Sequence, residues 1–297
     1  MDATSVIGQA TAPDGVELRT RHWPRIATDA EPWAAVLLVH GLGEHSGRYE
    51  HVGRWLTTAG IDVHAYDQRG FGASGGRRAY VDRWSQLHDD LAARLEAVRA
   101  LSSGLPVAIY GHSLGGLVSL GYALTDRPAP DRLILSGPAI DAAVPASRRL
   151  AVKLLGSLAP TLAVTSGVGE GVLSRDPLVE ERFRADPLSE QRTTLRLGQQ
   201  GFAEQDRVLG RLDRLDRLDL PTLVIHGGDD EYVPASASEV LEANPRVTRR
   251  VYPGLRHELH NEPEGHDVVG DVIAWLDAEL RGEATAGGAV RLAALQP

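Results

Sequence analysis

Residues 106–117 read Pro106-Val107-Ala108-Ile109-Tyr110-Gly111-His112-Ser113-Leu114-Gly115-Gly116-Leu117. An apolar run typical of a buried strand leads into a Gly-x-Ser-x-Gly motif, and a helix-compatible run follows it. This order predicts a sharp strand-to-helix turn that presents the Ser113 hydroxyl at the top of a sheet. Gly111 and Gly115 suit such a turn because a side chain at either position would collide with a neighbouring strand or helix. Ser113 is therefore the candidate nucleophile. In a chain with 32 glycines the motif alone could arise by chance, so the remaining pattern has to support it.

The rest of the chain alternates short apolar runs with helical patterns. We expect further strands at Ala34–Val39, Ile61–Tyr66, Leu133–Leu135 and Thr222–Ile225, and helices at Tyr49–Ala59, Trp84–Leu101, Leu117–Thr125 and His266–Arg281. Such alternation predicts an α/β fold with a mainly parallel sheet and helices on both faces. The rough alternation of Val16–Trp23 after the Asp14-Gly15 turn predicts an antiparallel strand at the sheet edge.

Between residues 139 and 201 the strand rhythm stops and helical apolar patterning takes over, broken by Pro160, Pro177 and Pro187. We expect a helical cap over 139–201, inserted between two parts of one core, 1–138 and 202–281. The microrepeat 211–219 predicts a surface helix. The tail 282–297 is rich in Ala and Gly with little to bury, so we expect it to be disordered.

Composition excludes several classes of function. The 297 residues are 42% hydrophobic and 24% charged, as in globular proteins, and the net charge of -9 disfavours nucleic acid as a partner. The absence of cysteine excludes disulfides, Cys-ligated zinc and a thiol nucleophile. The first ten residues lack the pattern of a secretory signal, and no apolar run is long enough to span a bilayer. These features predict a soluble, cytoplasmic protein.

A serine nucleophile needs a base and an orienting acid later in the chain, in the order Ser, Asp, His. Asp230 follows the expected strand Thr222–Ile225 and is preferred to its neighbour Asp229, which suits a turn or helix-cap role. His257 lies between a late strand and the last helix, with His260 and His266 as rivals. The predicted catalytic residues are Ser113, Asp230 and His257.

The loop His40-Gly41-Leu42-Gly43-Glu44-His45 follows an expected strand end. Its backbone can supply an oxyanion-hole donor, the N–H of Leu42, beside the N–H of Leu114. We expect no cofactor and no metal. Residues 70–75 match Gly-x-Gly-x-x-Gly but precede no helix, and His257 and His260 are three apart where a zinc-protease helix needs four.

The sequence resembles the monoacylglycerol lipases and lysophospholipase-like bacterial relatives of the α/β-hydrolase fold from about Gly15 to Leu280. The likeness is carried by residues 40–49, 66–76 and 111–116, and by Ser174-Arg175-Asp176-Pro177 and Asp186-Pro187-Leu188 in the expected cap. It implies a serine hydrolase that cleaves carboxylic esters, most plausibly monoacylglycerol to fatty acid and glycerol, through an acyl-enzyme. The alternatives are a carboxylesterase or lysophospholipase of other substrate range and, in a different class, a non-catalytic ligand-binding protein.

The family's motifs also place the triad acid on Asp230 and the base on His257, and imply that Glu44, Arg48 and His112 lie near the glycerol end of the pocket. One departure is Gln68 with Phe71, where the family usually has histidines. The partner implied is a small-molecule lipid ester. Basic residues beside apolar ones in the expected cap, Arg148, Arg149 and Lys153, fit either a cover for an acyl pocket, which we favour, or a transient peripheral membrane contact. The sequence indicates no oligomeric state.

Overall fold

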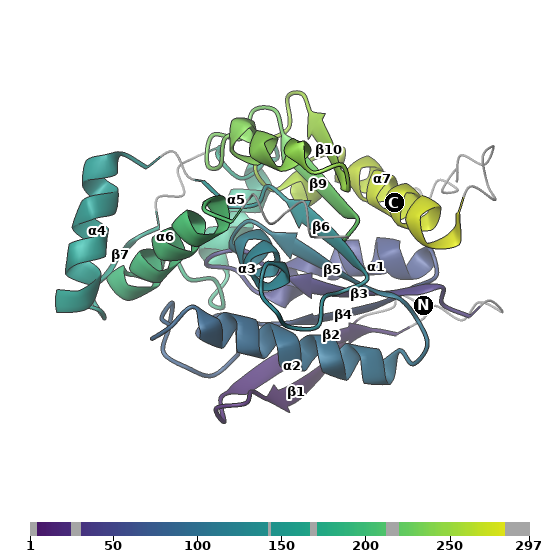
Figure 1. The fold of residues 1–297 in the computed structure, drawn as a ribbon, viewed down its shortest axis with the longest axis horizontal. Helices are drawn as coiled ribbons and strands as arrows, with labels where there is room; N and C mark the ends of the chain where they lie inside the picture. The colour runs from purple at the N-terminus through teal and green to yellow at the C-terminus, as the bar shows by residue number, and fades with distance from the viewer. Residues whose placement is uncertain (1–4, 25–30, 142–143, 167–170, 212–219, 283–297) are drawn as a thin grey trace.

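The computed structural model describes residues 5–24, 31–141, 144–166, 171–211 and 220–282, and an eight-stranded sheet forms its centre (Figure 1). The strand order is β1-β2-β4-β3-β5-β6-β9-β10. All neighbours from β4 to β10 pair in parallel, whereas β1 and β2 are antiparallel. The strands are β1 (Val6–Thr11), β2 (Glu17–Trp23), β3 (Ala34–Val39), β4 (Ile61–Tyr66), β5 (Val107–His112), β6 (Arg132–Ser136), β9 (Thr222–Gly227) and β10 (Val247–Tyr252).

Helices cover both faces of this sheet because its central strands are apolar on both sides. Along β3, Ala35, Leu37 and Val39 pack with α2 (Ser85–Leu101) and α3 (Leu114–Ala123). Val36 and Leu38 point the other way, toward α1 (Glu50–Thr58) and α7 (Gly265–Arg281). The predicted α/β class, with a mainly parallel sheet between two helical layers, is confirmed.

The prediction that the strand near Val16–Trp23 forms the sheet edge is wrong. β2 is antiparallel as expected, but β1 pairs along its outer side and forms the edge. Five of the six β1 residues are exposed, so the sequence of this strand shows no alternation of apolar and polar residues. A second difference concerns α3, which begins at Leu114 rather than Leu117 because the turn at Ser113 leads directly into the helix.

The region expected to be a cap contains α4 (Ala146–Leu158), α5 (Pro177–Ala185) and α6 (Leu195–Leu209), of which α4 and α6 lie to the left of the sheet in Figure 1. It also contains a two-stranded antiparallel sheet, β7 (Ala163–Thr165) with β8 (Arg192–Thr194), whose strands are too short to give a sequence signal. The boundary predicted at 201 falls inside α6, which continues because Val208 packs in the main core.

Two expectations fall outside the described residues: the surface helix over most of 211–219 and the tail after Gly282. Within the described part of the chain, no helix is long and apolar enough to cross a bilayer.

Candidate active site

Ser113 lies in a strained turn between β5 and α3. Its φ of 52° and ψ of -116° lie outside the backbone regions that residues other than glycine usually adopt. A Cβ at Gly115 would lie 2.1 Å from the Val39 carbonyl oxygen, and one at Gly111 would lie 2.6 Å from the Gly115 carbonyl oxygen. Only glycine fits these close approaches, which is the physical reason for the Gly-x-Ser-x-Gly pattern.

The structure brings Ser113, His257 and Asp230 into one hydrogen-bonded row. His257 Nε2 lies 2.9 Å from Ser113 Oγ, and His257 Nδ1 lies 2.7 Å from Asp230 Oδ2. A carboxylate only accepts, so Nδ1 donates to Asp230 and Nε2 is left to accept the Ser113 hydroxyl proton. Asp230 follows β9 and His257 follows β10, and the carboxyl ends of parallel strands meet at one edge of the sheet.

The rival residues lie elsewhere. Asp229 is exposed, whereas Asp230 is 5% exposed. His260 stacks on Tyr49 with ring centroids 4.7 Å apart. His266 lies on α7, with Nδ1 3.7 Å from the Asp267 carboxylate.

Asp230 is held as a carboxylate. Burial opposes its ionisation, but the charge of His257 and hydrogen bonds from His226, His257 and the Val233 N–H outweigh burial and lower its pKa. Its Oδ1 accepts the N–H groups of Tyr232 at 2.9 Å and Val233 at 2.8 Å. Sequence reasoning missed His226, which is fully buried and lies at the end of β9 just before the loop that carries Asp230.

The two expected oxyanion donors lie beside Ser113. A Cβ at Gly41 would lie 3.2 Å from Ser113 Cβ, so the loop that carries Leu42 runs alongside Ser113. Glu44 fixes this loop by accepting the Gly41 N–H at 2.5 Å. Leu114 is the first residue of α3, so its N–H has no acceptor within the helix. Leu42 and Leu114 also line the same cavity as Ser113.

Ser113 also lines a small pocket of about 20 Å³, whose polar wall is formed by Glu44, His112, His257 and Glu258 and whose apolar wall includes Leu173 and Phe183. Arg48, expected at this pocket, is not among its lining residues. It lies behind them and donates to Glu258 at 2.6 and 2.8 Å and to Glu44 at 2.9 Å. Sequence reasoning missed the role of Glu258, because its partner Arg48 is far away in the chain.

His112 is uncharged at neutral pH. Burial, and then the nearby His257 ring at 4.9 Å, lower its pKa to about 4. Its Nδ1 lies 3.1 Å from the Ser136 carbonyl oxygen. The ring is thus fixed as a neutral, polar wall beside Ser113.

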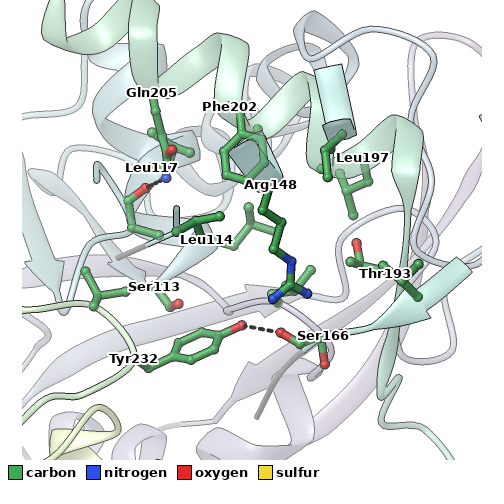
Figure 2. A pocket seen from close by; sticks show the side chains of 18 of the residues that line it. Ser113, Leu114, Leu117, Arg148, Ser166, Thr193, Leu197, Phe202, Gln205 and Tyr232 are labelled. Atoms are coloured by element: carbon green, nitrogen blue, oxygen red, sulfur yellow. Dashed lines mark hydrogen bonds between the residues drawn. The ribbon is translucent and has the colours of Figure 1, made fainter. Parts of the chain in front are cut away.

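Ser113 also lines a larger cavity of about 360 Å³, which extends to residues of α4 and α6. Figure 2 shows Leu114, Leu117, Leu197 and Phe202 on its walls, and the Tyr232 hydroxyl donating to the Ser166 carbonyl oxygen, 3.2 Å away. Arg148 lines this cavity and points into it (Figure 2), which fits the favoured interpretation of this segment as a cover for an acyl pocket.

The sheet covered on both faces and the strained serine turn define the α/β-hydrolase class. Residues 30–264 match the family model described as "Serine aminopeptidase, S33". The chain is 36% identical to the monoacylglycerol lipase of Mycolicibacterium smegmatis over 85% of this chain and 91% of that one. The chain belongs to this hydrolase family and is a carboxylic ester hydrolase, as predicted.

Solved structures of monoacylglycerol lipases have the same fold as this chain. The monoacylglycerol lipase of Paleococcus ferrophilus superposes with a TM-score of 0.76 at 30% identity, covering 84% of this chain and 96% of that one. A soluble variant of the Saccharomyces cerevisiae monoglyceride lipase, bound to a substrate analogue, gives a TM-score of 0.81. Its identity is 23%, over 93% of this chain and 96% of that one, so it supports the fold alone.

Proposed function

We propose that the protein hydrolyses monoacylglycerols to fatty acid and glycerol, with Ser113, His257 and Asp230 as its triad. One observation carries the proposal: Ser113 stands where two unlike cavities meet. The larger cavity suits one acyl chain. The small pocket beside Glu44 and His112 has room for little more than one water molecule, so only the polar group next to the ester bond is assigned to it. The relatives named as monoacylglycerol lipases support the same substrate class.

The geometry supports the following mechanism. His257 Nε2 takes the Ser113 proton, Oγ attacks the ester carbonyl carbon, and the N–H groups of Leu42 and Leu114 stabilise the resulting oxyanion. The ionised Asp230 stabilises the imidazolium through Nδ1. The imidazolium then gives its proton to the departing glycerol oxygen, which leaves an acyl-enzyme. Water repeats the sequence, releases the fatty acid and restores Ser113.

A fluorophosphonate probe tests the nucleophile. We expect the wild-type chain to be labelled and Ser113→Ala to remain unlabelled, with the modified peptide containing Ser113. A wild type that is not labelled would sink the enzymatic proposal in favour of a ligand-binding role.

A substrate panel tests the specificity. Fatty acid release is measured from mono-, di- and triacylglycerols, a lysophospholipid and short esters, with Ser113→Ala as the background. We expect monoacylglycerols to give the highest kcat/KM. If lysophospholipids or short esters are preferred instead, the lipase proposal fails while ester hydrolysis stands.

We also propose that the outer face of α4 contacts the lipid surface that supplies the substrate, as a peripheral contact of a cytoplasmic protein. Leu154 is 60% and Leu158 80% exposed on this helix. Arg149 and Lys153 pair with Asp206 at 3.1 and 2.6 Å, so the leucines rather than these basic residues carry the proposal. Exposed apolar surface of this kind partitions into a lipid interface.

Flotation with phosphatidylcholine vesicles tests the contact. We expect Leu154→Ser with Leu158→Ser to reduce vesicle binding and monoacylglycerol hydrolysis while a soluble short ester is cleaved at the wild-type rate. The matched control is Leu101→Ser at the end of α2, where the leucine is 69% exposed but distant from the cavity in sequence and fold. Equal binding of both variants would contradict the proposal.

A further inference from the structure

Three side chains unrelated to the triad converge at the side of the sheet formed by β2 and β4. His22 Nε2 lies 2.9 Å from Asp62 Oδ1, and His64 Nε2 lies 3.0 Å from Asp62 Oδ2. The donor atoms of this His22–Asp62–His64 cluster all lie within 4.8 Å of one another, and no other group of three such ligands was found among the described residues.

The sheet register builds this cluster. His22 on β2 pairs directly with His64 on β4. Their rings stack with centroids 4.6 Å apart and planes 16° apart. Asp62 lies two residues before His64 and therefore on the same face of β4. Because register and sheet twist fix all three backbones, the donors are held together without a ligand.

The Asp62 carboxylate is the shared acceptor of the cluster, with one oxygen facing each histidine. Ser102 Oγ, just after α2, donates to Asp62 Oδ2 and lies 3.4 Å from His64 Nε2. Two imidazoles, one carboxylate and a nearby hydroxyl form a donor set that suits zinc.

The cluster is open to solvent on one side. His22, Asp62 and His64 line a cavity of about 430 Å³. The side chain of His22 is 43% exposed, whereas those of Asp62 and His64 are 15% and 7% exposed. An ion and its water ligands can therefore enter past His22.

We propose that His22, Asp62 and His64 form a zinc-binding site that is separate from the active site and stabilises the β2–β4 pair. Ligand atoms about 2.0 Å from a tetrahedral zinc lie about 3.3 Å apart, and the two histidine–carboxylate spacings of 2.9 and 3.0 Å are close to this value. Because the His22 and His64 rings are stacked, binding also requires the partly exposed His22 ring to rotate until both Nε2 lone pairs face the ion. Water takes the fourth position. This proposal departs from the sequence-based expectation that the chain has no metal ligands.

The site is not catalytic. Asp62 aligns through β3 with Val107 at the start of β5, whereas Ser113 follows the end of β5. Six residues of strand separate the two levels, which is about 20 Å at the usual rise per residue. Zinc at the cluster should therefore raise the unfolding temperature and leave ester hydrolysis unchanged.

Isothermal titration of the metal-free, untagged full chain with zinc chloride tests the proposal. We expect one ion per chain. Binding should weaken at least about tenfold in His22→Ala and in His64→Ala, because losing even an outer-shell partner costs about 10- to 100-fold in metal sites. The half-exposed His22 is the safer variant for folding. His266→Ala, another histidine beside a carboxylate, is the matched control and should bind as wild type does.

Two results would overturn the proposal. One is unchanged affinity in His22→Ala and His64→Ala. The other is zinc that inhibits ester hydrolysis and still binds both variants, which would place the ion at His257 and Asp230.

A substitution of Arg94 should strengthen zinc binding, whereas the histidine substitutions should weaken it. Its side chain lines the same cavity, and among the described residues its buried Nε has no hydrogen-bond partner. A guanidinium repels a dication, so Arg94→Gln should tighten zinc binding by about twofold or more. Weaker binding in this variant would contradict a cation site and favour an anion held by Arg94, which titration with inorganic phosphate would detect.

Discussion

At the scale of single residues, Asp230 decides which nitrogen of His257 carries the proton. Asp230→Asn keeps the size of the side chain but can donate to Nδ1, which moves the imidazole proton to Nε2 and removes the acceptor for Ser113. We expect kcat for a short soluble ester to fall by about 10⁴ with little change in KM. Steady-state kinetics would measure this, and a fall of less than tenfold would exclude the orienting role.

Two glycines can be compared to test whether Gly115 is required because a side chain would not fit. In Gly115→Ala the new Cβ meets the Val39 carbonyl oxygen of the central strand β3, which cannot move aside. We expect the free energy of unfolding to fall by at least about 2 kcal/mol. The control is Gly270→Ala on α7, where a Cβ has no neighbour within 4 Å. That variant should be about 0.5–1 kcal/mol more stable. Urea titrations of both variants give the comparison, and equal effects would refute the steric argument.

At the scale of elements, Arg69 ties the loop after β4 to α2. It donates to both carboxylate oxygens of the fully buried Asp90 at 2.6 Å, and to Asp14 on the surface side. Burial raises the pKa of Asp90 despite the opposing effect of Arg69. Without Arg69, Asp90 would have no ion-pair partner among the described residues, so its buried carboxyl would either stay charged at high cost or take up a proton.

We therefore expect Arg69→Met to lower the free energy of unfolding by about 3–5 kcal/mol at pH 7. Asp14→Asn removes the other partner, whose side chain is 41% exposed, and should cost less than about 1 kcal/mol. Chemical denaturation measures both values. Similar losses in the two variants would show that burial does not set the cost.

The elements also show why part of the fold could be predicted from the sequence. The bounds of β3 and β4 match the prediction to the residue. β3 is a continuous apolar run because it is buried on both faces, whereas in β4 the polar Asp62 and His64 alternate with the apolar Ile61, Val63 and Ala65. β1 was missed because most of its side chains are exposed, and β7 and β8 because three residues show no periodicity. That Arg148, rather than Arg149 or Lys153, lines the cavity could not be predicted from the sequence, because the partner of a helix face depends on packing between elements.

The residues of the sites also divide into those that could be predicted from the sequence and those that could not. Ser113, Asp230 and His257 follow strand ends in a required order, so the sequence order itself brings them into consideration. Arg48 with Glu258, and the His22–Asp62–His64 cluster, depend on pairs distant in the chain or on the register of β2 against β4. No local motif records such pairs.

At the scale of the whole molecule, acid should destabilise the protein well before its carboxylates are protonated. Burial lowers the pKa of His40, His51, His112 and His260 below the usual value of 6.5. The folded chain keeps these rings neutral, while the unfolded chain protonates them below about pH 6.5. Their contribution is thus present above that pH and lost as the pH falls. Asp90 acts in the opposite direction because burial raises its pKa.

His112 allows this coupling to be measured at one site. Between pH 6.5 and its folded pKa of about 4, unfolding takes up one proton at His112. This uptake costs up to about 1.4 kcal/mol of stability per pH unit. We expect His112→Leu to show a shallower loss of unfolding free energy than wild type when urea titrations are compared at pH 7, 6 and 5. The variant also loses the contact of Nδ1 with the Ser136 carbonyl oxygen, but that loss shifts the whole curve and leaves its slope unchanged. Parallel curves for the two proteins would therefore mean that His112 is not held neutral in the folded state.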